Sequence, residues 1–302
     1  MRSPYDAVTV AHGLPSMSDM IYRIALKIEY QGTAYCGWQY QPHCDSVQGQ
    51  LQRALTQIAN EPIELACAGR TDTGVHAIGQ VAHFDTQAVR PLKAWIQGVN
   101  TQLPKDIRVV WAQQMAALTP EQWQMEQAKS VKESALFHAR FSAVARQYRY
   151  VIYNRAVPSA VLADRVTWEP MPLDEQAMHR AAQALIGEND FSSFRAAACQ
   201  AEHARREVQA IGVQRQGDFV LIDIQANAFL HHMVRNIAGT LLQVGRGEKA
   251  ESWVAALLAL QDRTQAGMTA PASGLYFVNA LYPQHWGIPR TPLSEVLWQC
   301  HS

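Results

Sequence analysis

The sequence has no excess of charge of either sign. It contains 26 Lys plus Arg and 26 Asp plus Glu among 302 residues, which gives a formal net charge of zero at pH 7. Composition alone therefore offers no argument for a polyanionic partner, and any surface that binds nucleic acid must be local. Two stretches of the chain could supply such a surface because they gather arginines: Arg140, Arg146, Arg149 and Arg155, and Arg195, Arg205 and Arg206.

Cysteine is scarce, and its spacing forms no pattern. The five cysteines are an odd number without a C-x-x-C pair: Cys36, Cys44, Cys67, Cys199 and Cys300. This argues against a disulfide framework or a structural zinc site, so we expect reduced thiols and no bound metal. His43 beside Cys44 is the nearest approach to a metal signal, but two adjacent residues lack the paired spacing of a tetrahedral site.

Long apolar runs are absent as well. No stretch approaches the roughly 20 apolar residues of a membrane-spanning helix, and the run at residues 7–11 is too short for the core of a signal peptide. We therefore expect a cytoplasmic protein without membrane contact. Residues 1–20 are expected to form a disordered leader, whereas the chain as a whole, with 48% hydrophobic residues, can bury a sizeable core.

After this leader, strand and helix patterns alternate through residues 21–144. Strand patterns occur at residues 21–30, 63–68, 80–84 and 107–113, and helix patterns at residues 46–60 and 91–101. Asp45 is the expected N-cap of the first helix. The segment from Thr119 to Gln122 resembles a capping box with Pro at the first helical position, which predicts an exposed helix over residues 119–132. We interpret residues 115–134, approximately, as a helical insertion.

Residues 145–302 repeat this style. An aromatic and β-branched strand pattern at residues 142–154 joins the two stretches. It is followed by helix patterns at residues 173–186, 229–244 and 251–260, a hairpin at residues 208–226 and a strand at residues 275–281. We predict an α+β fold in which two similar α/β halves share one large mixed, mainly antiparallel sheet with helices packed on it.

Asp72 lies between two glycines in the segment Gly69-Arg-Thr-Asp-Thr-Gly74, directly after a predicted strand. The backbone can turn tightly there and present the carboxylate. An Asx-type turn, in which Asp72 bonds only to its own backbone, is the plainer interpretation. Arg70, two residues earlier, is less expected in such a turn. Its guanidinium could keep Asp72 ionised and also hold a phosphate.

Several ordered motifs resemble those of the tRNA pseudouridine synthase A family. They are AGRTDTGVHA at residues 68–77, FHARF at 137–141, YRY at 148–150, FSSFR at 191–195 and HHMVRN at 231–236. The resemblance covers about residues 21–285. It implies the pseudouridine synthase fold and an isomerase that detaches uracil, rotates it and rejoins it through C5 at positions 38, 39 and 40 of the tRNA anticodon stem-loop. It also implies a homodimer whose two subunits contact one tRNA, with no metal and no cofactor.

The resemblance assigns the catalytic roles. Asp72 is the essential carboxylate, acting either as a nucleophile toward the sugar or the base or as a base that takes a ribose proton. Arg70 matches the residue that helps to draw the target nucleotide out of the stack. Tyr148 matches the aromatic that stacks on the flipped base and can assist proton transfer. Its plainer interpretation is an inward-facing strand aromatic, as for Tyr150 on the same face.

Arg235 lies among apolar neighbours on the long predicted helix, where an unpaired cation would be costly. We expect Asp72 to be its partner, which would place the active-site cleft between the two halves. A structural pair with another acid is the alternative. Leu275 matches an apolar residue that packs against the base, although it also fits ordinary strand core.

RNA contacts are expected on two further segments. Residues 137–141 combine a cation with aromatic side chains, which suits phosphate contact and stacking: Phe137, His138, Ala139, Arg140 and Phe141. Arg195, Cys199 and Gln200 form the second set, although Ala201 and Glu202 stand where the family usually has a hydroxyl residue and a cation.

Two other functions compete with the synthase. A catalytically silent RNA-binding protein of the same fold would have lost Asp72 or Tyr148, and both are present. A metal-dependent hydrolase would need further ligands around Asp72, where only His76 and Asp85 lie nearby in the sequence.

Overall fold

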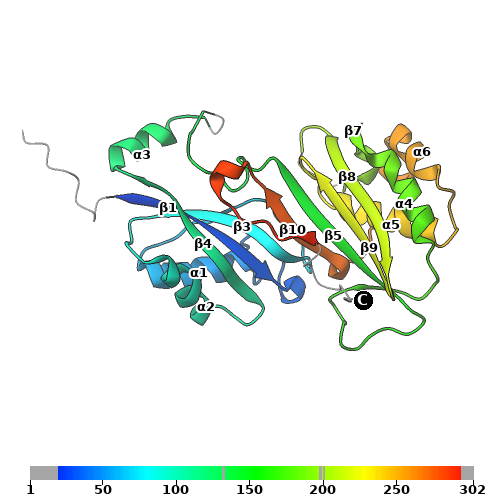
Figure 1. The fold of residues 1–302 in the computed structure, drawn as a ribbon, viewed down its shortest axis with the longest axis horizontal. Helices are drawn as coiled ribbons and strands as arrows, with labels where there is room; N and C mark the ends of the chain where they lie inside the picture. Colours follow the sequence, from blue (N-terminus) through cyan, green and yellow to red (C-terminus); the bar gives the residue numbers. More distant parts are fainter. Residues whose placement is uncertain (1–19, 131–132, 197–198, 200, 294–302) are drawn as a thin grey trace, which may run out of the picture.

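The computed structural model describes residues 20–130, 133–196, 199 and 201–293. Within them, one ten-stranded sheet forms the centre of the molecule (Figure 1). Its strands are β1 (Ile21–Tyr30), β2 (Ala66–Cys67), β3 (His76–Thr86), β4 (Ile107–Leu118), β5 (Ala145–Asn154), β6 (Thr167–Glu169), β7 (Gly187–Asp190), β8 (Arg205–Gln216), β9 (Phe219–Ala226) and β10 (Leu275–Leu281). The expected leader at residues 1–19, Gln200 and Cys300 lie outside the described residues.

The sheet is mixed and mainly antiparallel, as predicted. The strand order is β4-β1-β3-β10-β5-β9-β8-β7, with β2 beside β3 and β6 beside β5. Only the β3–β10 and β5–β6 pairs are parallel among the described strands. β10, the latest of these strands in the chain, lies between β3 from the first predicted half and β5 from the second. A division of the chain at residues 144 and 145 stays a prediction, because the sheet continues across it.

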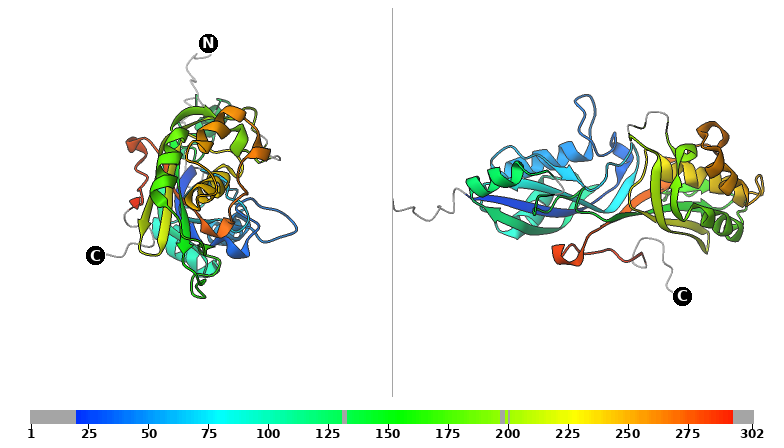
Figure 2. Two further views of the ribbon diagram at one scale, coloured as in Figure 1. Left: turned by 90° about the vertical axis from the view of Figure 1, so that its right-hand side faces the viewer. Right: turned by 90° about the horizontal axis from the view of Figure 1, so that it is seen from above.

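Most helices of the described residues lie on one side of this sheet. The helices are α1 (Val47–Ala59), α2 (Val99–Gln102), α3 (Pro120–Gln127), α4 (Glu175–Ala182), α5 (Met233–Gly245) and α6 (Trp253–Leu260). Figure 2 shows α1, α4, α5 and α6 on one side of the sheet and the segment after β10 on the other. This segment is tied down by the Lys27 ammonium group, which donates to the carbonyl of Pro289 (3.2 Å) and to the hydroxyl of Thr291 (2.6 Å).

Several predicted boundaries differ from the observed ones for physical reasons. Ser46, and not Asp45, caps α1, because its extended backbone lets its hydroxyl accept from the Gly49 N–H at 3.2 Å. α5 begins at Met233, four residues later than expected, because His232 has a left-handed backbone (φ 61°) that no helix can contain. The predicted capping box of Thr119 and Gln122 is present at the start of α3, which buries none of its residues.

The expectation that all cysteines are reduced was wrong for two of them. Cys36 and Cys44 form a disulfide, with their Cα atoms 6.3 Å apart, whereas Cys67 and Cys199 are free. The chain folds back between the two residues, since the Cys36 N–H donates to the Asp45 carbonyl (2.9 Å) and Gln41 bridges to Cys44. A separation of eight residues carries no signal of this fold-back in the sequence.

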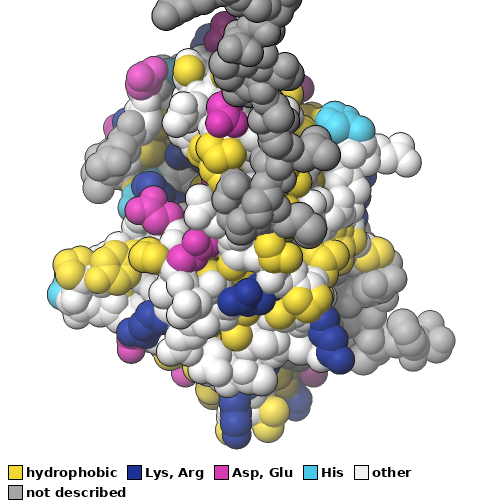
Figure 3. All heavy atoms as spheres, turned by 90° about the vertical axis from the view of Figure 1, so that its left-hand side faces the viewer, with side chains coloured by type: hydrophobic (Ala, Val, Ile, Leu, Met, Phe, Trp, Pro, Cys, Tyr) yellow, Lys and Arg dark blue, Asp and Glu magenta, His cyan; other side chains and the backbone are white. Residues whose placement is uncertain are grey.

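Arg146 and Arg149, from the first predicted cluster of arginines, do not lie on one face. Arg146 and Arg149 are three residues apart on β5, so the alternation of a strand turns them to opposite sides of the sheet. The Arg149 guanidinium is buried and paired with the Asp223 carboxylate at 2.7 Å. Charged side chains of both signs are scattered over the end of the molecule that carries α3 (Figure 3). Among the described residues, no helix is long and apolar enough to cross a membrane.

Candidate active site

The backbone before Asp72 is held by a side chain and a neighbouring loop. Asp72 lies in the loop between β2 and β3. The N–H of Trp38 donates to the Thr71 carbonyl at 3.0 Å, and the side-chain amide of Gln80 donates to the Gly69 carbonyl at 2.6 Å. Since these bonds restrain the loop before Asp72, the carboxylate is presented from a rigid support.

Two glycines allow this loop to be packed so closely. Gly37 has a φ of 93°, and a Cβ atom there would lie 2.5 Å from the Thr71 carbonyl oxygen. Gly74 closes the loop with a φ of 79°. A side chain at either position would be strained, so the segment around the Cys36–Cys44 disulfide can press directly on the loop that carries Asp72.

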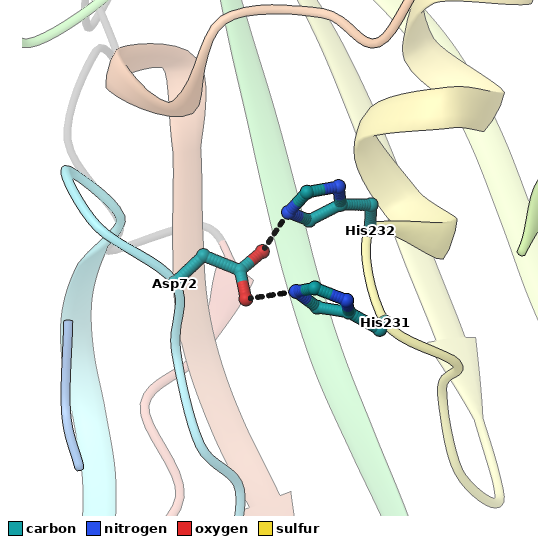
Figure 4. A group of neighbouring side chains, drawn as sticks. All are labelled: Asp72, His231 and His232. Carbon is teal, nitrogen blue, oxygen red and sulfur yellow. Dashed lines mark ion pairs between the residues drawn. The ribbon is translucent and has the colours of Figure 1, made fainter. Parts of the chain in front are cut away.

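The Asp72 carboxylate points toward the start of α5, and both lie over the same face of the sheet (Figure 4). Its Oδ1 atom lies 3.3 Å from Nε2 of His231, and its Oδ2 atom lies 3.4 Å from Nε2 of His232 and 3.8 Å from Nη1 of Arg235. The predicted pairing of Asp72 with Arg235 is therefore confirmed. No hydrogen bond joins the carboxylate to its own loop in the described part of the chain, so the interpretation as a plain Asx turn does not hold.

Both histidines were missed as site residues. They stand in the HHMVRN motif, from which only Arg235 was assigned a role, although their position within one helical turn of the predicted cation was a usable signal. The search for ligands around Asp72 considered only its neighbours in the sequence, His76 and Asp85. The premise that no further ligands surround Asp72 was therefore wrong, because the histidines come from the distant start of α5.

Arg235 is the permanent cation beside Asp72. Its side chain is 16% exposed, and its Nε donates to the Ala270 carbonyl at 2.8 Å, which fixes its direction. Burial lowers the pKa of His232 below its ordinary value of 6.5; the nearby Asp72 charge opposes this shift, and the positive charges of His231 and Arg235 add to it. His232 is therefore neutral at pH 7. Arg70 is exposed and forms no ion pair with Asp72 among the described residues. Arg235, and not Arg70, is therefore the arginine that pairs with the carboxylate.

Tyr148 lies on β5 close to the Asp72 loop. Its hydroxyl would be 3.8 Å from a Cβ atom at Gly69, and its ring is nearly perpendicular to Phe229 and Phe277, with centroids 5.0 and 5.1 Å away. Burial raises the pKa of the Tyr148 phenol, and the Asp72 charge raises it further, so the hydroxyl stays protonated. That hydroxyl has no hydrogen-bond partner among the described residues, which leaves it available to a substrate.

Tyr150, two residues further along β5, has a structural role. Its hydroxyl donates to the Pro271 carbonyl at 2.8 Å and is hydrogen-bonded to Thr167 at 2.5 Å. Leu275 lies opposite Tyr150 at the start of β10 and is buried. Of the two tyrosines on this face, Tyr148 is therefore the one with a free polar group.

Arg146 was counted only as part of a basic stretch, but it holds the site together. Its guanidinium donates to the carbonyls of Ala68 (3.2 Å), Asn227 (3.0 Å) and Arg140. These carbonyls belong to three separate segments, one of which leads directly into the Asp72 loop. Burial lowers the pKa of Arg146.

Residues 137–141 divide into buried and exposed parts. Phe137 and Ala139 are buried, and the Ala139 N–H donates to Nδ1 of His83 at 3.2 Å, so these two residues do not reach the surface. His138 is half-buried. Arg140 and Phe141 are exposed, with the guanidinium 5.5 Å from the ring centroid. The expected combination of stacking and phosphate contact is therefore available from Phe141 and Arg140, and not from Phe137.

The Arg195 loop lies beside the histidines. The Arg195 guanidinium donates to the carbonyls of Cys199 (2.7 Å) and Ala201 (3.0 Å), and the Ala196 N–H donates to the His231 carbonyl at 3.0 Å. Burial raises the pKa of the Cys199 thiol, but hydrogen bonds from backbone groups of Ala201 and His231 and the Arg195 charge outweigh it, so the pKa is lowered. Arg195 thus shapes this loop. Gln200 lies outside the described residues.

A hollow of about 830 Å³ lies elsewhere, between the start of α4 and the end of α5, and neither Asp72 nor Tyr148 lines it. The site is therefore identified by its chemistry and not by the volume of a cavity.

Comparison with known proteins decides the family. Residues 27–122 and 181–283 match the family model described as tRNA pseudouridine synthase. The chain belongs to the tRNA pseudouridine synthase family. The synthase is similar to proteins named tRNA pseudouridine synthase A from three bacteria. It is 68% identical to that of Hydrogenovibrio crunogenus, over 91% of this chain and 98% of the relative. It is 51% identical to that of Cronobacter sakazakii, over 93% of this chain and 97% of the relative. It is 53% identical to that of Salmonella arizonae, over 92% of this chain and 97% of the relative.

These matches confirm the predicted family, fold and enzyme class. The synthase also retains both Asp72 and Tyr148. A catalytically silent RNA-binding protein is therefore not favoured.

Proposed function

We propose that this synthase converts uridine to pseudouridine at positions 38, 39 and 40 of the tRNA anticodon stem-loop, with Asp72 as the catalytic carboxylate. The observation that carries the proposal is the approach of Arg235 to within 3.8 Å of Asp72, from an element more than 160 residues later in the chain. We further propose that it acts as a cytoplasmic homodimer in which one tRNA contacts both subunits.

Asp72 and Arg235 together explain how the reaction can start. The guanidinium places a positive charge 3.8 Å from Oδ2 of Asp72. An ionised carboxylate is the form required both of a nucleophile and of a base. Asp72 then either attacks the sugar or the base of the target uridine or removes a ribose proton. In either route the uracil is detached, rotated and rejoined through C5, so the reaction is balanced without any co-reactant.

Tyr148 completes the chemistry. Its protonated hydroxyl can donate a hydrogen bond to the base, and its ring offers a surface for stacking. Leu275 supplies an apolar contact beside it.

Arg70, Arg140 and Phe141 are proposed to contact the RNA. All three are exposed, and a guanidinium can bind phosphate while an aromatic ring stacks on a base. Arg70 lies in the same loop as Asp72, two residues before it, where it can fill the space left when the target nucleotide leaves the stack. Such extrusion costs a few kcal/mol unless the gap is filled.

The decisive experiment maps pseudouridines in tRNA treated with wild-type protein or with Asp72→Asn, by chemical primer-extension stops. Wild type should produce stops at positions 38, 39 and 40. The variant should bind tRNA but react at least about 10³-fold more slowly, because the amide can neither attack nor accept a proton.

Asp218→Asn is the matched control, because Asp218 lies in an exposed turn and pairs only with the exposed Arg155 among the described residues. It should retain full activity. Normal product formation by Asp72→Asn would refute the assignment of Asp72, and stops at other uridines alone would refute the proposed positions.

A further inference from the structure

Three donor atoms converge at the catalytic carboxylate. The carboxylate of Asp72 and the imidazoles of His231 and His232 offer one ligand atom each, all within 4.8 Å of one another. The two histidines are adjacent in the chain, and their rings lie 3.9 Å apart with a tilt of 39°. Figure 4 shows both rings directing a nitrogen toward the carboxylate. The left-handed backbone of His232 reverses the chain, which lets neighbouring side chains point in one direction.

The distances are longer than those of ordinary hydrogen bonds and leave room for a metal ion. The contacts of Asp72 with the two imidazole nitrogens are 3.3 and 3.4 Å. An ordinary N–H···O hydrogen bond is about 2.7–3.2 Å long. Zinc holds nitrogen and oxygen ligands at about 2.0–2.2 Å, so two ligands at a tetrahedral angle lie about 3.3–3.5 Å apart. Each of the two contacts has the length of one such edge, but they involve different carboxylate oxygens, Oδ1 toward His231 and Oδ2 toward His232. A small rotation of the Asp72 carboxylate would be needed to bring one oxygen to both imidazoles.

We propose that Asp72, His231 and His232 bind a zinc ion and that this ion inhibits the synthase. Two imidazoles and one carboxylate form a ligand set that zinc accepts in proteins, with a fourth position left for water. Binding uses Asp72 as a ligand, so the carboxylate is no longer available to the uridine. The inhibition rests on the proposed catalytic role of Asp72, whereas the binding does not.

Arg235 limits the affinity of this site. Its guanidinium lies 3.8 Å from Asp72 and would repel a divalent cation. The ion is therefore a reversible inhibitor that competes with Arg235 for the carboxylate, and chelators should remove it.

Binding is tested first, by titrating Zn²⁺ alone into the full chain in a calorimeter without tRNA. One ion per chain is expected. The double variant His231→Asn/His232→Asn should lose this saturable binding. Each single variant should weaken it at least about 10-fold, the lower end of what changing even an outer-shell partner of a metal ligand costs. Asn tolerates the left-handed backbone at position 232, so the fold is kept, and circular dichroism melting checks this.

Two control variants exclude other zinc sites. His285→Ala removes an exposed histidine on the segment after β10 and should bind zinc like wild type. Cys36→Ser/Cys44→Ser removes the only described pair of cysteines that lie together, and it should also bind normally. Loss of binding in the cysteine variant, or its persistence in the double histidine variant, would overturn the site.

Activity is tested separately. Zn²⁺ should stop pseudouridine formation by the wild-type protein, and EDTA should restore it. Stoichiometric zinc binding by wild type together with an active Asp72→Asn variant would refute the catalytic assignment while leaving the metal site in place. Absence of zinc binding together with an inactive Asp72→Asn variant would refute the metal site alone.

Discussion

The two faces of strand β5 differ in whether their arginine has an acidic partner. On one face, Arg149 is paired with the Asp223 carboxylate at 2.7 Å. On the other, Arg146 has only carbonyl oxygens as hydrogen-bond acceptors among the described residues, and no carboxylate pairs with it. On the first face the positive charge is neutralised by its acidic partner. The second keeps a positive charge next to Tyr148 and the Asp72 loop.

This difference shows how a chain of zero net charge can act on a polyanion. The face with the Arg149–Asp223 pair belongs to the fold, and the face on which Arg146 has no acidic partner among the described residues belongs to the chemistry. Local charge balance and not overall composition separates the two roles. Substitutions on the two faces should therefore change different observables.

The largest contrast is expected between Tyr148 and its neighbour Gln147, which point to opposite faces. Tyr148→Phe keeps the ring but removes the hydroxyl, and it should lower kcat by about 10²–10⁴-fold, the typical contribution of a proton-transfer group. Affinity for tRNA should change little. Gln147 bonds to Gln225 (2.7 Å) on the other face, and Gln147→Ala should leave kcat unchanged. Equal losses in the two variants, measured in single-turnover reactions, would remove the functional distinction between the faces.

A smaller effect is expected from substitutions on the face that carries the Arg149–Asp223 pair, and it should appear in stability and not in activity. Arg149→Met leaves the Asp223 carboxylate without its buried partner and should lower the free energy of unfolding by about 3 kcal/mol in urea titrations. The double variant Arg149→Met/Asp223→Leu should recover most of this loss, because it removes both charges. If Arg149→Met instead abolished pseudouridine formation in a fully folded sample, the assignment of this face to the fold alone would be wrong.

The smallest expected effect is a loss of folding stability at acidic pH. Burial, with the positive charges of Arg23 and His138, holds the pKa of His83 well below its ordinary 6.5. Its Nδ1 also accepts the Ala139 N–H, which requires the neutral ring. The unfolded chain gains a proton as the pH falls through about 6.5 and the folded chain does not, so stability is lost below that pH, at most about 1.4 kcal/mol per pH unit for one group.

Melting temperatures between pH 7.5 and 5.5 measure this effect. His83→Asn removes the titrating ring, while the Asn carbonyl can still accept the Ala139 N–H. The slope of melting temperature against pH should be flatter in the variant. Identical slopes would show that His83 does not carry the acid sensitivity.

Sequence patterns predicted the sheet and the central ion pair for definite reasons. Strand patterns survive because their period is local, and the 275–281 pattern coincides with β10. The cost of an unpaired cation on an apolar helix predicted an acidic partner for Arg235, for which Asp72 was the candidate. That argument needs no knowledge of the fold beyond the helix itself.

What could not be predicted depends on the backbone path. The fold-back that joins Cys36 to Cys44 and the left-handed turn at His232 have no periodic signal in the sequence. The grouping of Arg146 with Arg149 was wrong for a reason that was available, since the two residues differ in parity along a strand. Parity distinguishes the faces of a strand, but only tertiary contacts reveal which face receives an acid.

The central place of β10 also bears on how the enzyme is made. A chain emerging from the ribosome presents β3 and β5 long before residues 275–281 appear, and until then the gap between the two strands is open. Asp72 and Arg235 are held at their final separation only once this late strand has been inserted. The strand order therefore predicts that the active site is completed late in translation, after residues 275–281 have left the ribosome.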